Sequence, residues 1–231
     1  MKALLLPGLD GTGALHDDFC RALGLDCEVL RYPKNMVRYD DLCRHVAEHL
    51  PTDPFVIIAE SFSGPLAIQI AASRPAKLRA IVFVASFAQA PRPAPAFAAK
   101  ALQWMPMKSR LACQMMQPAV MGRWANRKFT TTLWAALKTV PAKTLAARLD
   151  QVLRVDETAT FGAIDVPMLY LRATSDRLVP KAAARPFKAS GASVQNIDGP
   201  HFLLQAQPDA AAAAIRSFVT ALGVEAAPAS D

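Results

Sequence analysis

An apolar run that ends on a serine and continues as a helix constrains this chain more than any other feature. Residues 55–60 are mostly apolar and partly β-branched, which predicts a buried strand, and residues 66–72 predict a helix. Ser61 lies between them, with the small residues Ala59 and Ser63 two positions before and after it. Such a sharp turn lifts a serine hydroxyl above the sheet edge, beside the positive end of the helix dipole. The pattern therefore predicts that Ser61 is a nucleophile.

Predicted strands and helices alternate along most of the chain. Besides the run at 55–60, strands are expected at residues 2–6, 27–30, 79–85, 166–172 and 193–197. Helices are expected at residues 14–23, 39–50, 66–72, 181–189 and 206–222. This alternation is typical of βαβ units, which form a mostly parallel sheet flanked by helices. We therefore expect an α/β fold.

The alternation is interrupted between residues 91 and 160. Three alternating prolines at positions 91, 93 and 95 predict a stiff, extended connection, and no clear strand follows them. We expect an α/β core made of residues 1–90 and 161–231, with a helical lid inserted at 91–160. The net charge of +7 is concentrated there, because this segment has eleven Lys or Arg and only three Asp or Glu.

Composition limits the class of protein. With 231 residues and 52 % hydrophobic residues, the chain is long enough for one domain with a large core. No apolar run reaches membrane-spanning length, and the short run at residues 3–6 ends at Pro7, which predicts a strand rather than a signal peptide. The four cysteines show no C-x-x-C spacing. A cytoplasmic protein with reduced thiols is the expectation.

Two further side chains that suit nucleophilic catalysis follow later strands. Functional groups of a parallel sheet gather beyond the carboxyl ends of its strands. His201 is the one histidine of four that lies in a predicted loop at this edge, and Asp176 lies in the loop after the preceding strand. A serine needs a base, and that base needs an orienting acid. We predict His201 as the base and Asp176 as the acid; Asp198, three residues before His201, is the alternative acid.

An attacked carbonyl also needs hydrogen-bond donors for the oxyanion that forms. The backbone N–H of Phe62, directly after Ser61, is one candidate. The backbone N–H of Leu9, in the glycine-rich loop after the first strand, is the other. Gly8 and Gly11 would allow that loop to approach the site closely.

The motifs at residues 6–13, 59–64, 175–180 and 199–202 together resemble those of α/β-hydrolase fold proteins. The resemblance covers essentially the whole chain and implies a sheet of about six strands, a triad of Ser61, His201 and Asp176, and an acyl-enzyme mechanism without metal or cofactor. Pro7 replaces a histidine that is frequent in this superfamily, and Ala59 and Ser63 replace two glycines. Within the superfamily, the chain resembles small carboxylesterases, including pimeloyl-acyl-carrier-protein methyl ester esterases, and type II thioesterases.

The resemblance implies a serine ester hydrolase that acts through an acyl-Ser61 intermediate on a small-molecule or carrier-protein-linked acyl ester. A thioesterase or acyltransferase with the same triad is an alternative. A ligand-binding protein that retains the fold without turnover is another, because fold does not fix function. Acyl chain length and leaving group cannot be predicted from one sequence.

The inserted segment carries two groups of candidate residues. A substrate pocket is predicted at Trp104, Met105, Met121 and Trp124, with packing of the segment against the core as the alternative. A basic surface for an acidic carrier protein or an anionic lipid is predicted at Lys100, Lys108, Arg110, Arg123, Arg127 and Lys128, with a solvated face as the alternative.

Two other classes of binding site are not expected. Residues 45–49 match the H-x-x-E-H spelling of a metal site, but no further ligand is evident and the segment also predicts a solvated helix face. The basic residues lack the aromatic interleaving of nucleic-acid modules. We therefore predict no metal and no nucleic-acid partner.

Overall fold

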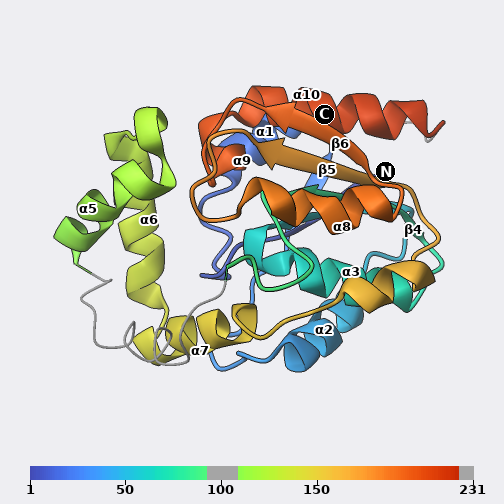
Figure 1. Cartoon of the computed structure of the whole chain (residues 1–231), viewed down its shortest axis with the longest axis horizontal. Coiled ribbons are helices and arrows are strands. Elements are labelled where there is room, and N and C mark those ends of the chain that lie inside the picture. Colours follow the sequence, from blue (N-terminus) through green and yellow to red (C-terminus); the bar gives the residue numbers. More distant parts are fainter. Residues whose placement is uncertain (93–108, 224–231) are drawn as a thin grey trace.

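The computed structural model describes residues 1–92 and 109–223, and a six-stranded parallel sheet lies at its centre (Figure 1). The strands are β1 (Lys2–Leu6), β2 (Asp26–Val29), β3 (Phe55–Glu60), β4 (Leu78–Val84), β5 (Met168–Ala173) and β6 (Ser193–Ile197). Their order in the sheet is β2-β1-β3-β4-β5-β6. β3 is thus an interior strand, and its Ala59 pairs with Leu6 on one side and Phe83 on the other. The predicted α/β fold and its parallel sheet are confirmed.

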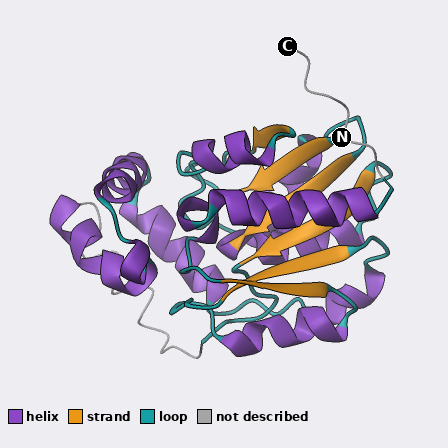
Figure 2. Cartoon of the chain, turned by 90° about the horizontal axis from the view of Figure 1, so that it is seen from above, coloured by secondary structure: helices purple, strands orange, loops and turns teal. Residues whose placement is uncertain are grey.

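Helices cover both faces of the sheet (Figures 1 and 2). One face carries α1 (Asp17–Leu23), α9 (Leu203–Ala206) and α10 (Pro208–Ala221), and the other carries α2 (Tyr39–Glu48), α3 (Gly64–Ala72) and α8 (Ala184–Ala189). Successive strand residues point to opposite faces, so Ile57 packs with α2 and α3 whereas Ile58 faces α1 and α10. Burial on both faces explains why β3 is a continuous apolar run rather than an alternating one.

The observed helices differ from the predicted bounds by a few residues, and in two of them the difference has a local cause. The helix predicted at 206–222 begins instead at Pro208, and Ala206 is the last residue of the separate helix α9; Gln207 between them has a φ of −137° and a ψ of 54°, which are not helical. The cause is Pro208, since a proline disfavours helical geometry in the residue before it. The helix predicted from residue 14 begins only at Asp17, because residues 13–16 form a turn closed by the bond from the His16 N–H to the Gly13 carbonyl.

Between β4 and β5, the described residues form three α-helices: α5 (Arg110–Val120), α6 (Arg127–Thr139) and α7 (Ala142–Val152). They stand together to one side of the sheet (Figure 1) and share an apolar cluster that includes Cys113, Leu133 and Leu145. Short 3-10 turns, η2 (Gly122–Trp124) and η3 (Thr158–Ala163), follow α5 and α7. Part of the predicted insertion, residues 93–108, lies outside the described residues. That α5 to α7 act as a lid stays a prediction.

Within the described ranges, no helix is both long enough and apolar enough to cross a lipid bilayer.

The turn after β3 shows why the residues around Ser61 are small. A 3-10 turn, η1 (Ser61–Ser63), joins β3 directly to α3. The tightest contact lies at Gly64, where an added Cβ would be 2.0 Å from the Ser86 Oγ and 2.8 Å from the Phe87 carbonyl oxygen. A glycine is therefore required three positions after the serine, where α3 packs against the end of β4.

Replacing this glycine tests the packing of the turn. We expect Gly64→Ala to lower the free energy of unfolding by about 1–3 kcal/mol, because the methyl group overpacks a buried contact. Gly162→Ala is the matched control, since nothing lies within 4 Å of an added Cβ there; it should be neutral or stabilise by about 0.5 kcal/mol. Urea denaturation of both variants measures the difference. Equal stabilities of the two variants would contradict this account of the turn.

Candidate active site

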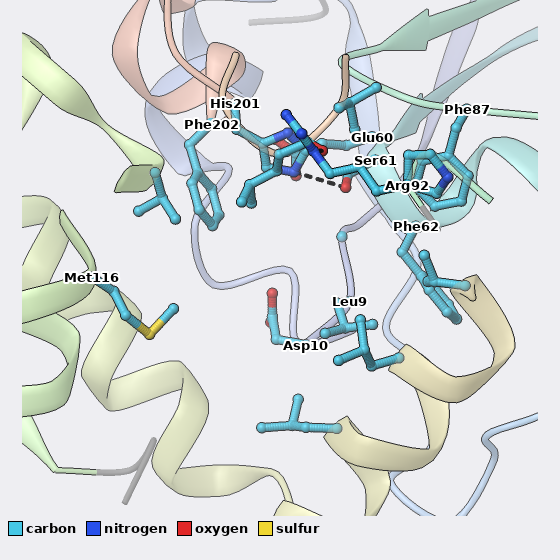
Figure 3. A pocket seen from close by; sticks show the side chains of 18 of the residues that line it. Leu9, Asp10, Glu60, Ser61, Phe62, Phe87, Arg92, Met116, His201 and Phe202 are labelled. Atoms are coloured by element: carbon cyan, nitrogen blue, oxygen red, sulfur yellow. Dashed lines mark hydrogen bonds between the residues drawn. The ribbon is translucent and has the colours of Figure 1, made fainter. Parts of the chain in front are cut away.

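The loops after β3, β5 and β6 bring three side chains together at the carboxyl edge of the sheet, and Figure 3 shows two of them, Ser61 and His201. The Ser61 Oγ lies 2.9 Å from the His201 Nε2, and the His201 Nδ1 lies 2.8 Å from the Asp176 Oδ2. His201 and Asp176 are buried, and Ser61 is partly exposed. The three residues thus form a continuous line of hydrogen bonds from the carboxylate to the hydroxyl.

The Asp176 carboxylate is held by the backbone that follows it. Its Oδ1 accepts hydrogen bonds from the N–H groups of Leu178 and Val179 at 2.8 and 2.9 Å, which leaves Oδ2 for His201. A carboxylate at Nδ1 favours the tautomer that keeps the Nε2 lone pair directed at Ser61. Asp198, the alternative acid, is instead exposed and paired with Arg123. The structure therefore favours Asp176 as the partner of the imidazole.

Ser61 is held in an unusual backbone conformation. Its φ is 48°, in the left-handed region that costs a non-glycine residue free energy. The Ser61 carbonyl accepts a 2.6 Å hydrogen bond from the Ser86 Oγ, and the Tyr170 hydroxyl donates to the Ser86 carbonyl at 2.7 Å. Burial raises the pKa of Tyr170, so its hydroxyl stays a donor. This buried chain of bonds fixes the turn that presents the serine.

Ser63 links the turn to the glycine-rich loop after β1. Its hydroxyl donates to the Pro7 carbonyl and lies 2.6 Å from the Tyr32 hydroxyl. Because Ser63 donates to Pro7, Tyr32 is the donor to Ser63. The serine at a position where glycine is usual is thus accommodated by two polar partners. It also anchors the loop that contains Leu9.

A cavity of about 320 Å³ opens beside Ser61 (Figure 3). One wall carries Ser61, His201, Gly8, Leu9 and Phe62. The opposite wall is apolar and comes from α5, α6 and α7; its residues are Met116, Val120, Leu133, Leu137, Leu145, Leu149 and Val152. A concave, mostly apolar space next to a polar group is typical of a small-molecule site.

Of the four predicted pocket residues, two cannot be compared with this cavity and two do not line it. Trp104 and Met105 lie outside the described residues. Met121 and Trp124 do not line the cavity: Met121 is buried in the cluster shared by α5 to α7, and Trp124 stacks under the Arg123 guanidinium at 4.3 Å. Met116 takes the role expected of a pocket methionine. The sequence predicts a helix at residues 140–155, where α7 lies, but the predicted pocket did not include its Leu145, Leu149 and Val152, which have the spacing of one helix face.

The predicted basic residues are partly neutralised. Arg123 pairs with Asp198 and Lys128 pairs with Asp18, so both cations join the inserted helices to the core. Arg110 and Arg127 are exposed, whereas Lys100 and Lys108 lie outside the described residues. A carrier-protein partner for this surface stays a prediction.

A buried ion pair under the nucleophile was not anticipated. Glu60 follows Val56 and Ile58 on the face of β3 that points to α1, where its carboxylate lies 2.8 Å from the His16 Nε2. Burial alone would lower the pKa of His16, but the charge and hydrogen bond of Glu60 outweigh it and raise that pKa. Burial would raise the pKa of Glu60, but His16 outweighs it and lowers that pKa. Each group therefore favours the charged form of the other.

The His45, Glu48 and His49 side chains lie together on α2, with candidate ligand atoms within 4.8 Å of one another. None of the three lines the cavity. A ring nitrogen of each histidine bonds a backbone carbonyl, that of Arg31 for His45 and that of His45 for His49. We assign this cluster no part in the chemistry of the site.

The ion pair predicts a pH-dependent contribution to stability. The pKa of His16 is raised, so its contribution is complete below the unfolded value near 6.5 and is lost as pH rises through the folded pKa. The pKa of Glu60 is lowered, so its contribution is present above the unfolded value near 4.5 and is lost as pH falls through the folded pKa. We therefore expect the unfolding free energy of wild type to exceed that of the double variant His16→Gln/Glu60→Gln by the largest amount between these two pH values.

Urea denaturation of both proteins from pH 4 to pH 9 measures that difference. The double variant replaces both ionisable side chains with neutral amides, so its own stability should not change with the titration of this pair. A difference that does not vary with pH would mean that the pair is not charged.

Comparison with known proteins places the chain in a known family. A family model described as serine aminopeptidase, S33, matches residues 23–199. No curated protein matches the sequence significantly.

Solved structures share the fold at low sequence identity. An enol-lactonase from Burkholderia xenovorans superposes with a TM-score of 0.81 at 16 % identity, covering 95 % of this chain and 91 % of that one. A bromoperoxidase from Bacillus anthracis gives 0.80 at 15 % identity, covering 95 % and 91 %. An esterase from Exiguobacterium antarcticum gives 0.80 at 11 % identity, covering 95 % and 92 %. These likenesses establish the α/β-hydrolase fold, and the finer resemblance to carrier-protein esterases stays a prediction.

Proposed function

The chain belongs to the hydrolase family described as serine aminopeptidase, S33, and from this premise we propose that it hydrolyses carboxylic esters through an acyl-Ser61 intermediate. The observation that carries the proposal is the hydrogen-bonded line from Asp176 through His201 to Ser61 at the wall of an apolar cavity. A hydroxyl with a base 2.9 Å away is ready for deprotonation. The apolar wall suits the acyl chain of an ester.

In the acylation step, the His201 Nε2 takes the proton of Ser61 as the Oγ forms a bond to the substrate carbonyl carbon. The tetrahedral intermediate then collapses, the ester C–O bond breaks, and His201 returns the proton to the leaving alkoxide. Water attacks the acyl-enzyme in the same way, with His201 as its base. Asp176 keeps the imidazole in the required tautomer and stabilises the imidazolium.

The N–H groups of Leu9 and Phe62 are the proposed oxyanion donors. Both residues line the cavity beside Ser61, and Phe62 follows it directly in the turn. One well-placed donor contributes about 3–4 kcal/mol to the stability of such a transition state. The bond from Ser63 to the Pro7 carbonyl supports the role of Leu9, because it ties the loop of Leu9 to the nucleophile turn.

Three other activities need to be distinguished from ester hydrolysis. The family description names a peptidase, and Asp10 and Glu60 are acidic residues in the cavity lining that would suit a substrate ammonium group. However, Glu60 is paired with His16, and Asp10 accepts bonds from Thr12.

Thioester hydrolysis and acyl transfer use the same triad. A ligand-binding protein would show no turnover of any substrate.

A substrate panel tests the proposal. We expect p-nitrophenyl esters of two to twelve carbons to be hydrolysed with higher kcat/KM than acyl-coenzyme A and acyl-carrier-protein thioesters or aminoacyl p-nitroanilides. Ser61→Ala should lower kcat on the best ester ~10⁴-fold or more, because the intermediate cannot form. Preference for a thioester or an anilide, or an added alcohol outcompeting water, would replace the proposal with the corresponding alternative. No turnover of any substrate would favour the ligand-binding protein.

A further inference from the structure

A single arginine holds the loop that carries Leu9. Arg148 lies on α7 and is completely buried. Its Nη1 donates to the carbonyls of Leu9 and Asp10 at 3.0 Å each. Its Nη2 donates to the carbonyls of Pro33 and Met36 at 3.0 and 3.1 Å, and its Nε donates to Met36 at 3.2 Å. Arg148 forms no salt bridge with any carboxylate in the described part of the chain.

A buried cation without an anionic partner is costly, so its hydrogen bonds must offset the loss of water. Arg148 meets this requirement with the planar fork of its guanidinium, which reaches two separate stretches of backbone at once, residues 9–10 and 33–36. A lysine ammonium is a point charge and cannot replace that fork. The guanidinium therefore joins α7 to two loops in one fixed geometry.

These bonds restrict the direction of the Leu9 N–H. The Pro7 carbonyl is fixed by Ser63 on one side, and the Leu9 and Asp10 carbonyls are fixed by Arg148 on the other. The peptide unit between them, which joins Gly8 to Leu9, has its own carbonyl bonded to the Gly11 N–H at 3.0 Å. In a trans peptide the N–H points opposite to the C=O. The Leu9 N–H therefore points away from Gly11, opposite to the Gly8 carbonyl that Gly11 binds.

Gly11 allows the guanidinium to lie directly against the loop. An added Cβ at Gly11 would be 2.6 Å from the Arg148 Nη1 and 2.8 Å from the Tyr32 Cβ, and its φ is +68°. Only glycine satisfies both the contact and the backbone conformation at low cost. Arg148, Gly11 and the loop are thus fitted to one another.

We propose that Arg148 is a positioning residue for catalysis, which holds the Leu9 N–H in the direction needed to bind the oxyanion. The inference rests on the proposed ester hydrolysis. The same helix lines the cavity with Leu145, Leu149 and Val152, so α7 contributes both to the acyl site and to the position of the oxyanion loop. Arg148 touches no reacting atom, and its effect on the reaction passes through Leu9.

The experiment compares Arg148→Lys and Arg148→Met with Thr144→Val. Thr144 is a matched control because it lies one turn earlier on α7, is buried, and donates its side-chain hydrogen bond to the Lys34 carbonyl at 2.8 Å rather than to the Leu9 loop. Each variant is checked for folding by circular dichroism and thermal unfolding. We then measure kcat and KM on p-nitrophenyl butyrate, the Ki of butylboronic acid, which forms a tetrahedral adduct with a nucleophilic serine, and the Kd of the matching butyl ether.

For Arg148→Lys and Arg148→Met we expect kcat to fall about 10²-fold, the loss typical of one oxyanion donor, with KM within about threefold of wild type. The Ki of the boronic acid should rise by a similar factor, while the Kd of the ether stays unchanged. Thr144→Val should keep kcat within about threefold of wild type. If Arg148 had a purely structural role, its variants would instead lower the affinity for both ligands together or lower only the stability of the protein.

Several results would overturn the proposal. One is a folded Arg148→Lys with wild-type kcat, and another is an equal loss of kcat in Thr144→Val. Failure of both Arg148 variants to fold while Thr144→Val folds would show that the arginine holds the structure together rather than positioning the loop. An inactive wild type, measured beside Ser61→Ala, would overturn the proposed function as well, whereas an active wild type with any of the other results overturns only the inference about Arg148.

Discussion

The backbone at Ser61, with a φ of 48°, is the constraint on which the site depends. It is imposed from three directions, by an interior strand buried on both faces, by α3 beginning directly after the turn, and by the Ser86 hydroxyl on the Ser61 carbonyl. A strained residue persists only where its surroundings over-determine it. The close contact at Gly64 belongs to the same arrangement, because it lets α3 approach the end of β4.

Buried polar groups connect the turn at Ser61 to the loops and helices around it. Ser63 joins the turn to the loop after β1, and Arg148 joins that loop to the helix that lines the cavity. Glu60 and His16 neutralise each other below the turn. Nucleophile, oxyanion loop and acyl site are therefore connected by hydrogen bonds through segments far apart in the sequence. Preorganised dipoles of this kind are the largest contribution to many enzymatic rate accelerations.

The sequence predicts a feature well where the residue type and its position relative to the predicted strands both indicate the same structure or role. The sheet was predictable because apolar strands alternate with helices, and Ser61, Asp176 and His201 each follow a predicted strand. Arg148 was not predictable, because it is one of eleven cations in its segment and its partners are backbone carbonyls, which leave no trace in the sequence. Met121 was misassigned for a related reason: which face of an inserted helix meets the cavity depends on packing between helices.

The central claim is that Ser61 is an activated nucleophile, and a fluorophosphonate tests it without any assumption about the natural substrate. The protein is treated with the probe and digested, and the modified peptide is identified by mass spectrometry. The account predicts one adduct, on Ser61, which is absent in Ser61→Ala and forms much more slowly in His201→Ala. Wild-type protein that remains unlabelled, or that is labelled equally well without His201, would contradict it.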